Sequence, residues 1–376
     1  MTSSEGAPSG NPKKIAVLWD TFGPQHVDRL NDVAKTFPAL LGVELFGQSH
    51  EYDWSWTPER RFESVTLSKV RRSPFFDGLS VIRTLVQLRI GRGIDDWFLC
   101  HYERPYILVG AWLLRLLGAR VFIMQDSRFE DKPRRALAEW IKSFFYGPYA
   151  GAISATTGTT AYLRYLGLKG PIAEGYDTGS VARISSYAPK GEVAFRDRPF
   201  LFVARLLEQK NPVGFMTAYA DYVAKAKDTP RPLVMIGSGP EEAAVKRIAE
   251  ERGVLQHITF IPWANQPDVV AHMGRALYLF LPSVMEPFGN VVGEAACVGL
   301  PAVLSDVCGA RDLITRDFVS GFTLPANDAA SWSEAMVHLA EDEALWRRMR
   351  AGALAAAPAF DSARFVDAIE MLTASR

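Results

Sequence analysis

Short, continuously apolar runs alternate with longer helical patterns along most of the chain. In the first half these runs lie at residues 14–20, 97–101, 119–125 and 151–156. Segments whose apolar residues recur at helical spacing lie between them, such as residues 133–147. Strands that are apolar on both faces and separated by helices form parallel sheets covered on both sides. The alternation therefore predicts an α/β fold with a doubly wound sheet.

The same pattern begins again in the second half of the chain. Five further apolar runs, each leading into a helical segment, lie at residues 199–205, 232–237, 257–262, 278–282 and 301–306. A length of 376 residues is enough for two domains, each with its own core. Residues 174–198 between the two sets contain mixed polar residues, Gly and Pro, which is typical of an interdomain connection. We therefore predict two Rossmann-like domains.

Charge and cysteine content restrict the partners and the compartment. The 42 basic and 42 acidic residues give a formal net charge of zero, which argues against a nucleic-acid binder. The three cysteines, Cys100, Cys297 and Cys308, form no C-x-x-C pair, so we expect neither a disulfide framework nor a zinc site. The first 14 residues lack the apolar core of a signal peptide, and no apolar run reaches the length of a spanning helix. We expect a cytoplasmic protein.

Two cations follow the first strand of the second half. Open α/β sheets bind ligands at the carboxyl ends of their strands, so the loop after residues 199–205 is a candidate site. Arg205 and Lys210 leave this strand end together, before a helix that Asn211 can cap and Pro212 can open. The pair suits a phosphate-rich ligand, although two solvated loop cations would give the same pattern. In the next loop, Gly237, Ser238 and Gly239 let backbone approach a ligand closely, and their helix can offer N–H groups to an anion.

The segment "EPFGNVVGEAACVGLP" places one glutamate before a helix and another inside it. The amides of Asn290 and Val291 at the helix N-terminus can hold a diphosphate oxygen. Glu294, one turn in, can accept two hydrogen bonds from a ribose diol. Glu286, outside the helix, would face the group beyond the phosphates, and a sugar with several hydroxyls is the natural candidate.

In order and spacing, "ARLLEQKNP", "MIGSGPEE" and "EPFGNVVGEAACVGLP" resemble the retaining family 4 glycosyltransferases of the GT-B fold, and the resemblance covers most of residues 199–335. It implies that Arg205 and Lys210 bind the diphosphate of a nucleoside-diphosphate sugar, UDP- or GDP-linked, with no other cofactor. It implies that Glu294 binds the ribose and that Glu286 contacts the transferred sugar. The expected donor-binding set is Gly23, Gly237, Ser238, Gly239, Phe288, Gly289, Asn290, Val291 and Glu294.

The resemblance also fixes the expected architecture. We expect an acceptor-binding domain over residues 1–178 and a nucleotide-sugar-binding domain over residues 179–360, facing each other across a cleft. The final helix, residues 361–376, is expected to cross back onto the first domain.

The N-terminal half resembles the family more loosely. Residues 14–35 look like the first strand, glycine loop and helix near the donor phosphates, with His26 as the titratable side chain of the loop. His26 is therefore a candidate catalytic residue, and a helix-start residue with local hydrogen bonds is the alternative. Where family members often carry histidine, this chain has Gln125. His101 and Asp126 are possible neighbours of the acceptor.

The expected chemistry is transfer of the sugar with retention of its anomeric configuration, as the resemblance implies. Negative charge grows on the departing diphosphate, and fixed cations stabilise it. Arg205, Lys210 and Glu286 are therefore placed in the catalytic set with His26. The sequence contains no D-x-D motif, so we expect no metal. The acceptor is expected to be a glycan or a lipid-linked hydroxyl.

Two other functions remain open at this stage. One is a sugar-nucleotide epimerase or phosphorylase on the same fold, which would not need an acceptor to release nucleotide. The other is a catalytically silent sugar-nucleotide-binding subunit, an alternative that Gln125 keeps open. Residues 58–92 are rich in arginine with apolar residues interleaved, so they could lie on an anionic membrane at its cytoplasmic face. A core-packed helix with solvated arginines is the alternative, and we favour it because charge runs usually serve only solubility.

Overall fold

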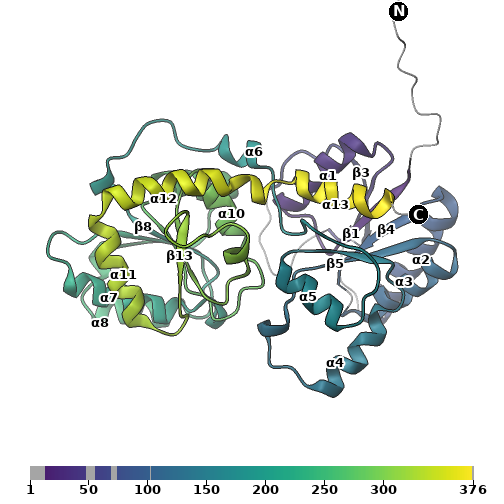
Figure 1. Ribbon diagram of the computed structural model, residues 1–376, viewed down its shortest axis with the longest axis horizontal. Coiled ribbons are helices and arrows are strands. Elements are labelled where there is room, and N and C mark those ends of the chain that lie inside the picture. Colours follow the sequence, from purple (N-terminus) through teal and green to yellow (C-terminus); the bar gives the residue numbers. More distant parts are fainter. Residues whose placement is uncertain (1–12, 48–55, 69–73, 102, 375–376) are drawn as a thin grey trace, which may run out of the picture.

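The computed structural model describes residues 13–47, 56–68, 74–101 and 103–374, which form two α/β domains side by side (Figure 1). The first domain contains a parallel seven-stranded sheet in the order β3-β2-β1-β4-β5-β6-β7. Its strands are β1 (Ile15–Trp19), β2 (Leu41–Phe46), β3 (Glu63–Ser68), β4 (Asp96–Leu99), β5 (Arg120–Gln125), β6 (Gly151–Ser154) and β7 (Ile172–Glu174).

The second domain contains a parallel six-stranded sheet in the order β10-β9-β8-β11-β12-β13. Its strands are β8 (Phe200–Val203), β9 (Leu233–Ile236), β10 (Ile258–Ile261), β11 (Leu279–Leu281), β12 (Ala302–Ser305) and β13 (Gly321–Leu324). Both sheets reverse their strand order once, between β1 and β4 in the first domain and between β8 and β11 in the second. Such reversals open a crevice at the carboxyl ends of the strands.

Helices cover these sheets in the order that the alternating pattern predicts. In the first domain they are α1 (Pro24–Thr36), α2 (Pro74–Arg92), α3 (Pro105–Leu116), α4 (Ala136–Ser143) and α5 (Thr157–Tyr165). After the first sheet follow α6 (Val181–Ser185), α7 (Pro212–Lys225), α8 (Glu242–Glu251), α9 (Gln266–Arg275), α10 (Asn290–Cys297), α11 (Ala329–Glu341), α12 (Glu343–Ala356) and α13 (Ala363–Ala374). Within the described residues, no helix combines the length and the apolar character that crossing a membrane requires.

Strand β1 shows why continuous apolar runs predict buried strands. Its side chains alternate between two clusters, with Ile15 and Val17 in one and Ala16 and Leu18 in the other. All four are completely buried. Because both faces of the sheet are covered, every position along such a strand is apolar.

The pattern of apolar runs did not reveal β2, β3, β7 and β13. Strand β3, "ESVTLS", pairs only with β2 at one edge of the sheet, and most of its described side chains are at least partly exposed, so it lacks a continuous apolar run. Strand β7 has three residues and contains Glu174, and β13 begins at a glycine and contains Thr323, so neither has a continuous run of large apolar residues. Strand β2 is entirely buried and apolar apart from Glu44.

The C-terminal helix crosses back onto the first domain, as expected from the resemblance. Helix α12 lies along the second domain, and α13 continues over the first, where it contacts α1, β6 and β7 (Figure 1). Arg120 of β5 donates to the carbonyl of Thr373 at 3.1 Å, and Phe365 and Ile369 are completely buried. The chain thus ties the two domains together at a second point besides the connection after β7.

Candidate functional site

The site lies at the reversal point of the second sheet, on the side that contacts the first domain. Arg205 and Lys210 follow β8, and Glu286 follows β11, so all three come from the reversal point of the second sheet. In the first domain, the segment after β5 contacts the Glu286 loop and the start of α1 contacts α10, as the hydrogen bonds below show. Arg205 is half-buried two residues beyond the end of β8.

Lys210 and Glu286 form an ion pair at the centre of the site. The Lys210 Nζ lies 2.5 Å from the Glu286 Oε2, and the Ser283 hydroxyl donates to the same oxygen at 3.2 Å. The side chains of Lys210 and Glu286 are 15% and 10% exposed. Because each charge has lost most of its water, each depends on the other for compensation. The two side chains therefore form a largely buried pair of opposite charges at the carboxyl ends of β8 and β11.

The loop between β8 and α7 differs in one detail from the sequence prediction. Pro212 opens α7 as expected, but the side chain of Asn211 does not cap the helix. Asn211 has a left-handed backbone, with φ of 52°, and its Nδ2 donates to the carbonyl of Ala326 at 3.0 Å. The cap prediction was wrong because the left-handed turn directs this side chain to a neighbouring loop instead.

The α10 N-terminus lies directly after Glu286. Gly289 has a φ of 98°, and a Cβ there would meet the Cys308 Sγ at 3.1 Å, so a glycine suits this turn. The turn starts the helix at Asn290, and the first amides of a helix have no partner within it. Phe288 is buried, and its carbonyl accepts from the Ala310 amide at 2.8 Å. Asn290 and Val291 thus stand at a rigid, partly positive helix end beside Lys210 and Glu286.

Glu294 joins the two domains one turn into α10. Its Oε1 accepts from the Gln25 Nε2 of the first domain at 2.6 Å and from the Gln266 Nε2 of α9 at 2.5 Å. Burial raises the pKa of Glu294, while the hydrogen bonds from Gln266 and Gln25 and the charge of Arg183 oppose the rise. Sequence reasoning missed both glutamines, because polar residues are common at the start of a helix and gave no particular signal.

The glycines after β9 allow their loop to pack closely against a neighbouring loop. Gly237 and Gly239 have φ values of 136° and 158°, and a Cβ at either would lie 2.0 Å or 2.4 Å from the carbonyl oxygens of Ala204 and Leu206. The carbonyl of Ser238 accepts from the Leu206 amide at 2.9 Å. This loop therefore packs tightly against the loop that carries Arg205, and the contact fixes that loop. A role of these three residues in ligand binding stays a prediction.

His26 makes the local hydrogen bond that one interpretation of the sequence expected. Its Nδ1 accepts from the Gly23 amide at 2.9 Å, at the start of α1. Its ring lies against Trp19, with 4.7 Å between the ring centroids. Burial lowers the pKa of His26 well below its usual value, and the charges of Arg29 and His101 lower it further. His26 is therefore a neutral, firmly held side chain, and its catalytic role stays a prediction.

His101 and Asp126 lie at the ends of β4 and β5. His101 has a φ of 63°, and its Nε2 accepts from the Asp20 amide at 3.2 Å. Burial raises the pKa of Asp126, and the negative charges of Asp131 and Glu286 raise it further. The charges of Asp126 and of Glu286 in the other domain therefore interact, and a role of His101 or Asp126 near an acceptor stays a prediction. Gln125 instead has structural partners, because its Oε1 accepts from the Tyr146 hydroxyl at 2.6 Å.

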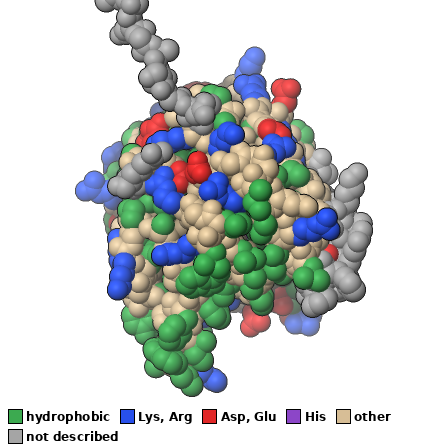
Figure 2. Space-filling model, turned by 90° about the vertical axis from the view of Figure 1, so that its right-hand side faces the viewer, with side chains coloured by type: hydrophobic (Ala, Val, Ile, Leu, Met, Phe, Trp, Pro, Cys, Tyr) green, Lys and Arg blue, Asp and Glu red, His purple; other side chains and the backbone are tan. Residues whose placement is uncertain are grey.

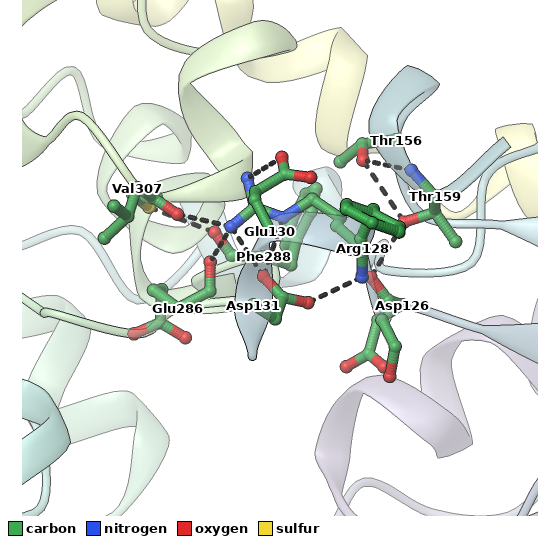
Figure 3. Close-up of polar contacts among 12 residues, drawn as sticks. Asp126, Arg128, Glu130, Asp131, Thr156, Thr159, Glu286, Phe288 and Val307 are labelled. Carbon is green, nitrogen blue, oxygen red and sulfur yellow. Dashed lines mark hydrogen bonds and ion pairs between the residues drawn. The ribbon is translucent and has the colours of Figure 1, made fainter. Parts of the chain in front are cut away.

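Arg128 connects β5 to the Glu286 loop across the domain interface (Figure 3). Its guanidinium donates to the backbone carbonyl of Glu286 at 3.0 Å and to the carbonyl of Val307. On its own domain it pairs with Asp131 at 2.9 Å. The Arg128 side chain is 1% exposed. Sequence reasoning missed this residue because its acceptors are backbone carbonyls of distant segments.

Asp177 is a further buried carboxyl at the interface that the sequence did not indicate. The side chain of Asn290, the first residue of α10, lies against it. Burial raises the pKa of Asp177 to about 7, with a further contribution from the charge of Asp126. Within the described part of the chain, no group of three or more His, Cys, Asp or Glu side chains is arranged to hold a metal ion.

The basic stretch at residues 58–92 packs largely against its own domain. Val81 and Leu85 of α2 are buried in the core, and α2 lies along α3. Several of its arginines form ion pairs within the domain: Arg60 with Glu44, Arg89 with Asp95, and Arg92 with Glu63. Lys69, Arg71 and Arg72 of this stretch lie outside the described residues. Membrane contact through residues 58–92 stays a prediction.

Comparison with known proteins identifies the second half of the chain most clearly. Residues 189–355 match the family described as glycosyl transferases group 1. D-inositol 3-phosphate glycosyltransferases of Jonesia denitrificans and Nocardia farcinica are both 31% identical to this chain, over 171 and 176 residues. These segments cover 44% and 45% of this chain but only 39% and 38% of those relatives. The match thus spans about two fifths of the relatives' length.

Solved structures resemble the chain over nearly its whole length. Sucrose-phosphate synthase from Thermosynechococcus elongatus has a TM-score of 0.71 at 16% identity, covering 97% of this chain and 100% of that chain. HepE of Anabaena, in complex with UDP and glucose, has a TM-score of 0.74 at 14% identity, with the same coverage. The predicted fold of two Rossmann-like domains in the GT-B arrangement is therefore confirmed.

Proposed function

We propose that the chain is a glycosyltransferase, because residues 189–355 match the family described as glycosyl transferases group 1. It takes a sugar from a nucleoside-diphosphate sugar and transfers it to an acceptor hydroxyl. The second domain binds the donor, and the first domain binds the acceptor.

The observation that carries this proposal is the ion pair between Lys210 and Glu286 beside the α10 N-terminus, with 2.5 Å between Nζ and Oε2. In the unbound site the two charges compensate each other. A sugar diphosphate supplies a new partner to each, because its phosphates take the ammonium and its sugar hydroxyls donate to the carboxylate. Arg205 and the α10 amides add positive charge at the same place.

These groups support departure of the nucleoside diphosphate. The bond between the anomeric carbon and the diphosphate oxygen breaks, and a bond from that carbon to the acceptor oxygen forms. The acceptor proton passes to the departing diphosphate, whose charge Lys210, Arg205 and the helix end stabilise. We propose that the reaction retains the anomeric configuration, with attack on the same face that the diphosphate leaves, and that it needs no metal.

Glu294 is proposed to bind the ribose of the donor. It lies one turn further along α10 than the amides proposed to hold the phosphates. Its Oε1 is occupied by Gln25 and Gln266, so ribose hydroxyls would donate to the second oxygen or replace one glutamine. Because Gln25 comes from the first domain, ribose binding would also adjust the contact between the domains.

The identity of the donor and acceptor is proposed in broad terms. The HepE structure holds UDP and glucose, so UDP-sugars are the first donors to test, followed by GDP-sugars. The D-inositol 3-phosphate glycosyltransferases align with this chain over less than half of their length. The proposed acceptor is therefore given only as a glycan or a lipid-linked hydroxyl.

Thermal stabilisation by nucleotide sugars tests the donor site directly, since a ligand that binds only the folded state raises the melting temperature. We expect a UDP- or GDP-sugar to stabilise the wild type and to lose this effect in Lys210→Ala. A matched control is Lys225→Ala, which removes an exposed lysine of α7. Absence of stabilisation by every nucleotide sugar would contradict the proposal. With the stabilising donor, release of nucleotide only when acceptors are added would distinguish transfer from epimerisation and from silent binding.

A further inference from the structure

Helix α4 and the next residue, Phe144, expose apolar side chains that the alternating pattern would place in the core. Leu137 is 68% exposed, Trp140 61%, Ile141 47% and Phe144 59%. We call these four residues the α4 surface. Helix α4 projects from the lower side of the first domain in Figure 1, and in Figure 2 apolar side chains gather toward the same lower end. Contiguous exposed apolar patches mark sites of contact with a protein or a membrane.

The ends of α4 are firmly attached to the domain. Before the helix, Arg134 donates to the carbonyl of Phe129 at 2.9 Å. After the helix, Tyr146 is buried and donates to Gln125 at 2.6 Å. The one buried side chain of α4 is Glu139, which accepts from Tyr162 and Lys142. The helix is therefore held in place by polar contacts, with its apolar side chains turned away from the core.

Positive charge borders the α4 surface. Lys132 and Arg135 precede the helix and are exposed. Within the described residues, neither forms an ion pair with a carboxylate. Between residues 132 and 146 the sole acidic residue is Glu139, and it is buried beside Lys142. An aromatic and aliphatic patch bordered by unpaired cations matches the interface of an anionic bilayer.

A cavity beside the end of α4 is also lined by positively charged side chains. It has a volume of about 560 Å³ and reaches Ser143 at the last turn of the helix. Arg115, Arg120 and Lys169 line it, and none of its lining residues is acidic. Arg120 also pairs with Asp96, so Arg115 and Lys169 contribute most to a positive lining. Phosphate headgroups are complementary to such a cavity.

We propose that the α4 surface docks the protein on an anionic lipid bilayer. Trp140 and Phe144 enter the boundary between headgroups and acyl chains, and Lys132 and Arg135 stay among the lipid phosphates. A second copy of the chain fits this surface less well. In a twofold interface the same patch faces itself, so the unpaired cations of one copy would lie close to those of the other.

Docking through α4 would also orient the proposed transfer site, a consequence that depends on the proposed function. Gln125, which holds the segment after α4, is the last residue of β5, and Asp126 and Arg128 follow it toward the other domain. The acceptor side of the site would thus lie near the bilayer. A lipid-linked acceptor is the class that this orientation favours.

Co-sedimentation with vesicles tests the docking without any sugar donor. The probes are vesicles of phosphatidylcholine alone and of phosphatidylcholine mixed with phosphatidylglycerol, at low and high salt. We expect the wild type to bind the mixed vesicles and to lose binding as salt rises. Trp140→Ser with Phe144→Ser should abolish binding, and Lys132→Gln with Arg135→Gln should weaken it roughly tenfold to thirtyfold.

Ile90→Ser is the matched control. Ile90 of α2 is 68% exposed, like the residues of the α4 surface, but it belongs to the basic stretch at residues 58–92. We expect this variant to bind like the wild type. Equal binding to both vesicle types, or loss of binding only in Ile90→Ser, would overturn the proposal. The proposal would also be overturned if the wild type bound no vesicles and instead formed a dimer that the α4 substitutions abolish. An unchanged melting temperature of the α4 variants without any ligand would show intact folding and keep this test separate from that of the donor site.

Discussion

The guanidinium of Arg128 donates to the backbone carbonyl of Glu286, 3.0 Å away in the other domain. The carboxylate of the same glutamate pairs with Lys210. The first domain therefore holds the main chain of the residue whose side chain we propose to contact the sugar. Through this one contact, the position of the domains relative to each other bears directly on the geometry of the site.

We expect Arg128→Met to destabilise the protein by about 3–5 kcal/mol, because it leaves the buried Asp131 carboxylate without its cation. Urea unfolding measures this loss. Arg128→Met combined with Asp131→Asn should recover part of it, since both charges are then gone. An exposed ion pair contributes less than about 1 kcal/mol to the free energy of unfolding. If Arg128→Met lost no more than that, Arg128 would not be a buried charge on which the fold depends.

We expect Lys210→Ala to reduce kcat/KM by roughly a hundredfold to a thousandfold, the usual effect of removing one group that stabilises developing negative charge. The variant also leaves Glu286 without its cation, so its stability should be measured beside its kinetics. Glu286→Gln keeps the shape of the side chain but removes the charge, so it should reduce the rate and also leave Lys210 without its counter-ion, and its stability should be measured in the same way. A Lys210→Ala enzyme with wild-type kcat/KM would remove the diphosphate assignment.

We expect Glu294→Ala to weaken nucleotide binding by roughly tenfold to a hundredfold, which corresponds to about 1.5–3 kcal/mol for hydrogen bonds to a charged group. Calorimetry with the free nucleotide measures the change. Glu250→Ala, an exposed glutamate at the end of α8, is the control for loss of a negative charge. Gln25→Ala should weaken binding less, because it removes a partner of Glu294 and leaves the carboxylate in place. Unchanged affinity in Glu294→Ala would rule out the ribose role.

The sequence predicted that Lys210, Glu286 and Glu294 follow strands of the second sheet, and the structure places them there, while their roles stay predictions. Each lies in a loop or helix that directly follows a continuously apolar strand, and the carboxyl ends of parallel strands meet at one edge of a sheet. Arg128 could not be found in this way. Its acceptors, the carbonyls of Glu286 and Val307, lie 158 and 179 residues further along the chain, and every residue type has such a carbonyl.

Helix α4 illustrates a different limit of the sequence pattern. Apolar residues at helical spacing, such as Leu137, Trp140, Ile141 and Phe144, are the same whether a helix packs on a sheet or faces outward. The sequence predicted the helix near its observed place but not the exposure of its apolar side. That exposure depends on Glu139, whose partners Tyr162 and Lys142 lie on the domain side of the helix.

The buried Asp177 makes stability depend on pH in a direction opposite to that of an ordinary paired carboxylate. Its pKa is raised to about 7 in the folded protein by burial and by the charge of Asp126, against about 3.9 in an unfolded chain. Between these values the folded state holds a proton that the unfolded state has released. Stability from this group is therefore fully present below about pH 4 and is lost as the pH rises through about 7.

We expect Asp177→Asn to remove this pH dependence. The variant should gain stability relative to the wild type as the pH rises from 4 to 8, by a few kcal/mol in total at about 1.4 kcal/mol per unit of pKa difference. Urea unfolding of both proteins at several pH values measures the difference, and titrating groups that do not interact with Asp177 cancel in the comparison. Parallel stability curves would show that Asp177 has an ordinary pKa. Its carboxyl would then be ionised against Asn290 at neutral pH, next to the helix end proposed to hold the diphosphate.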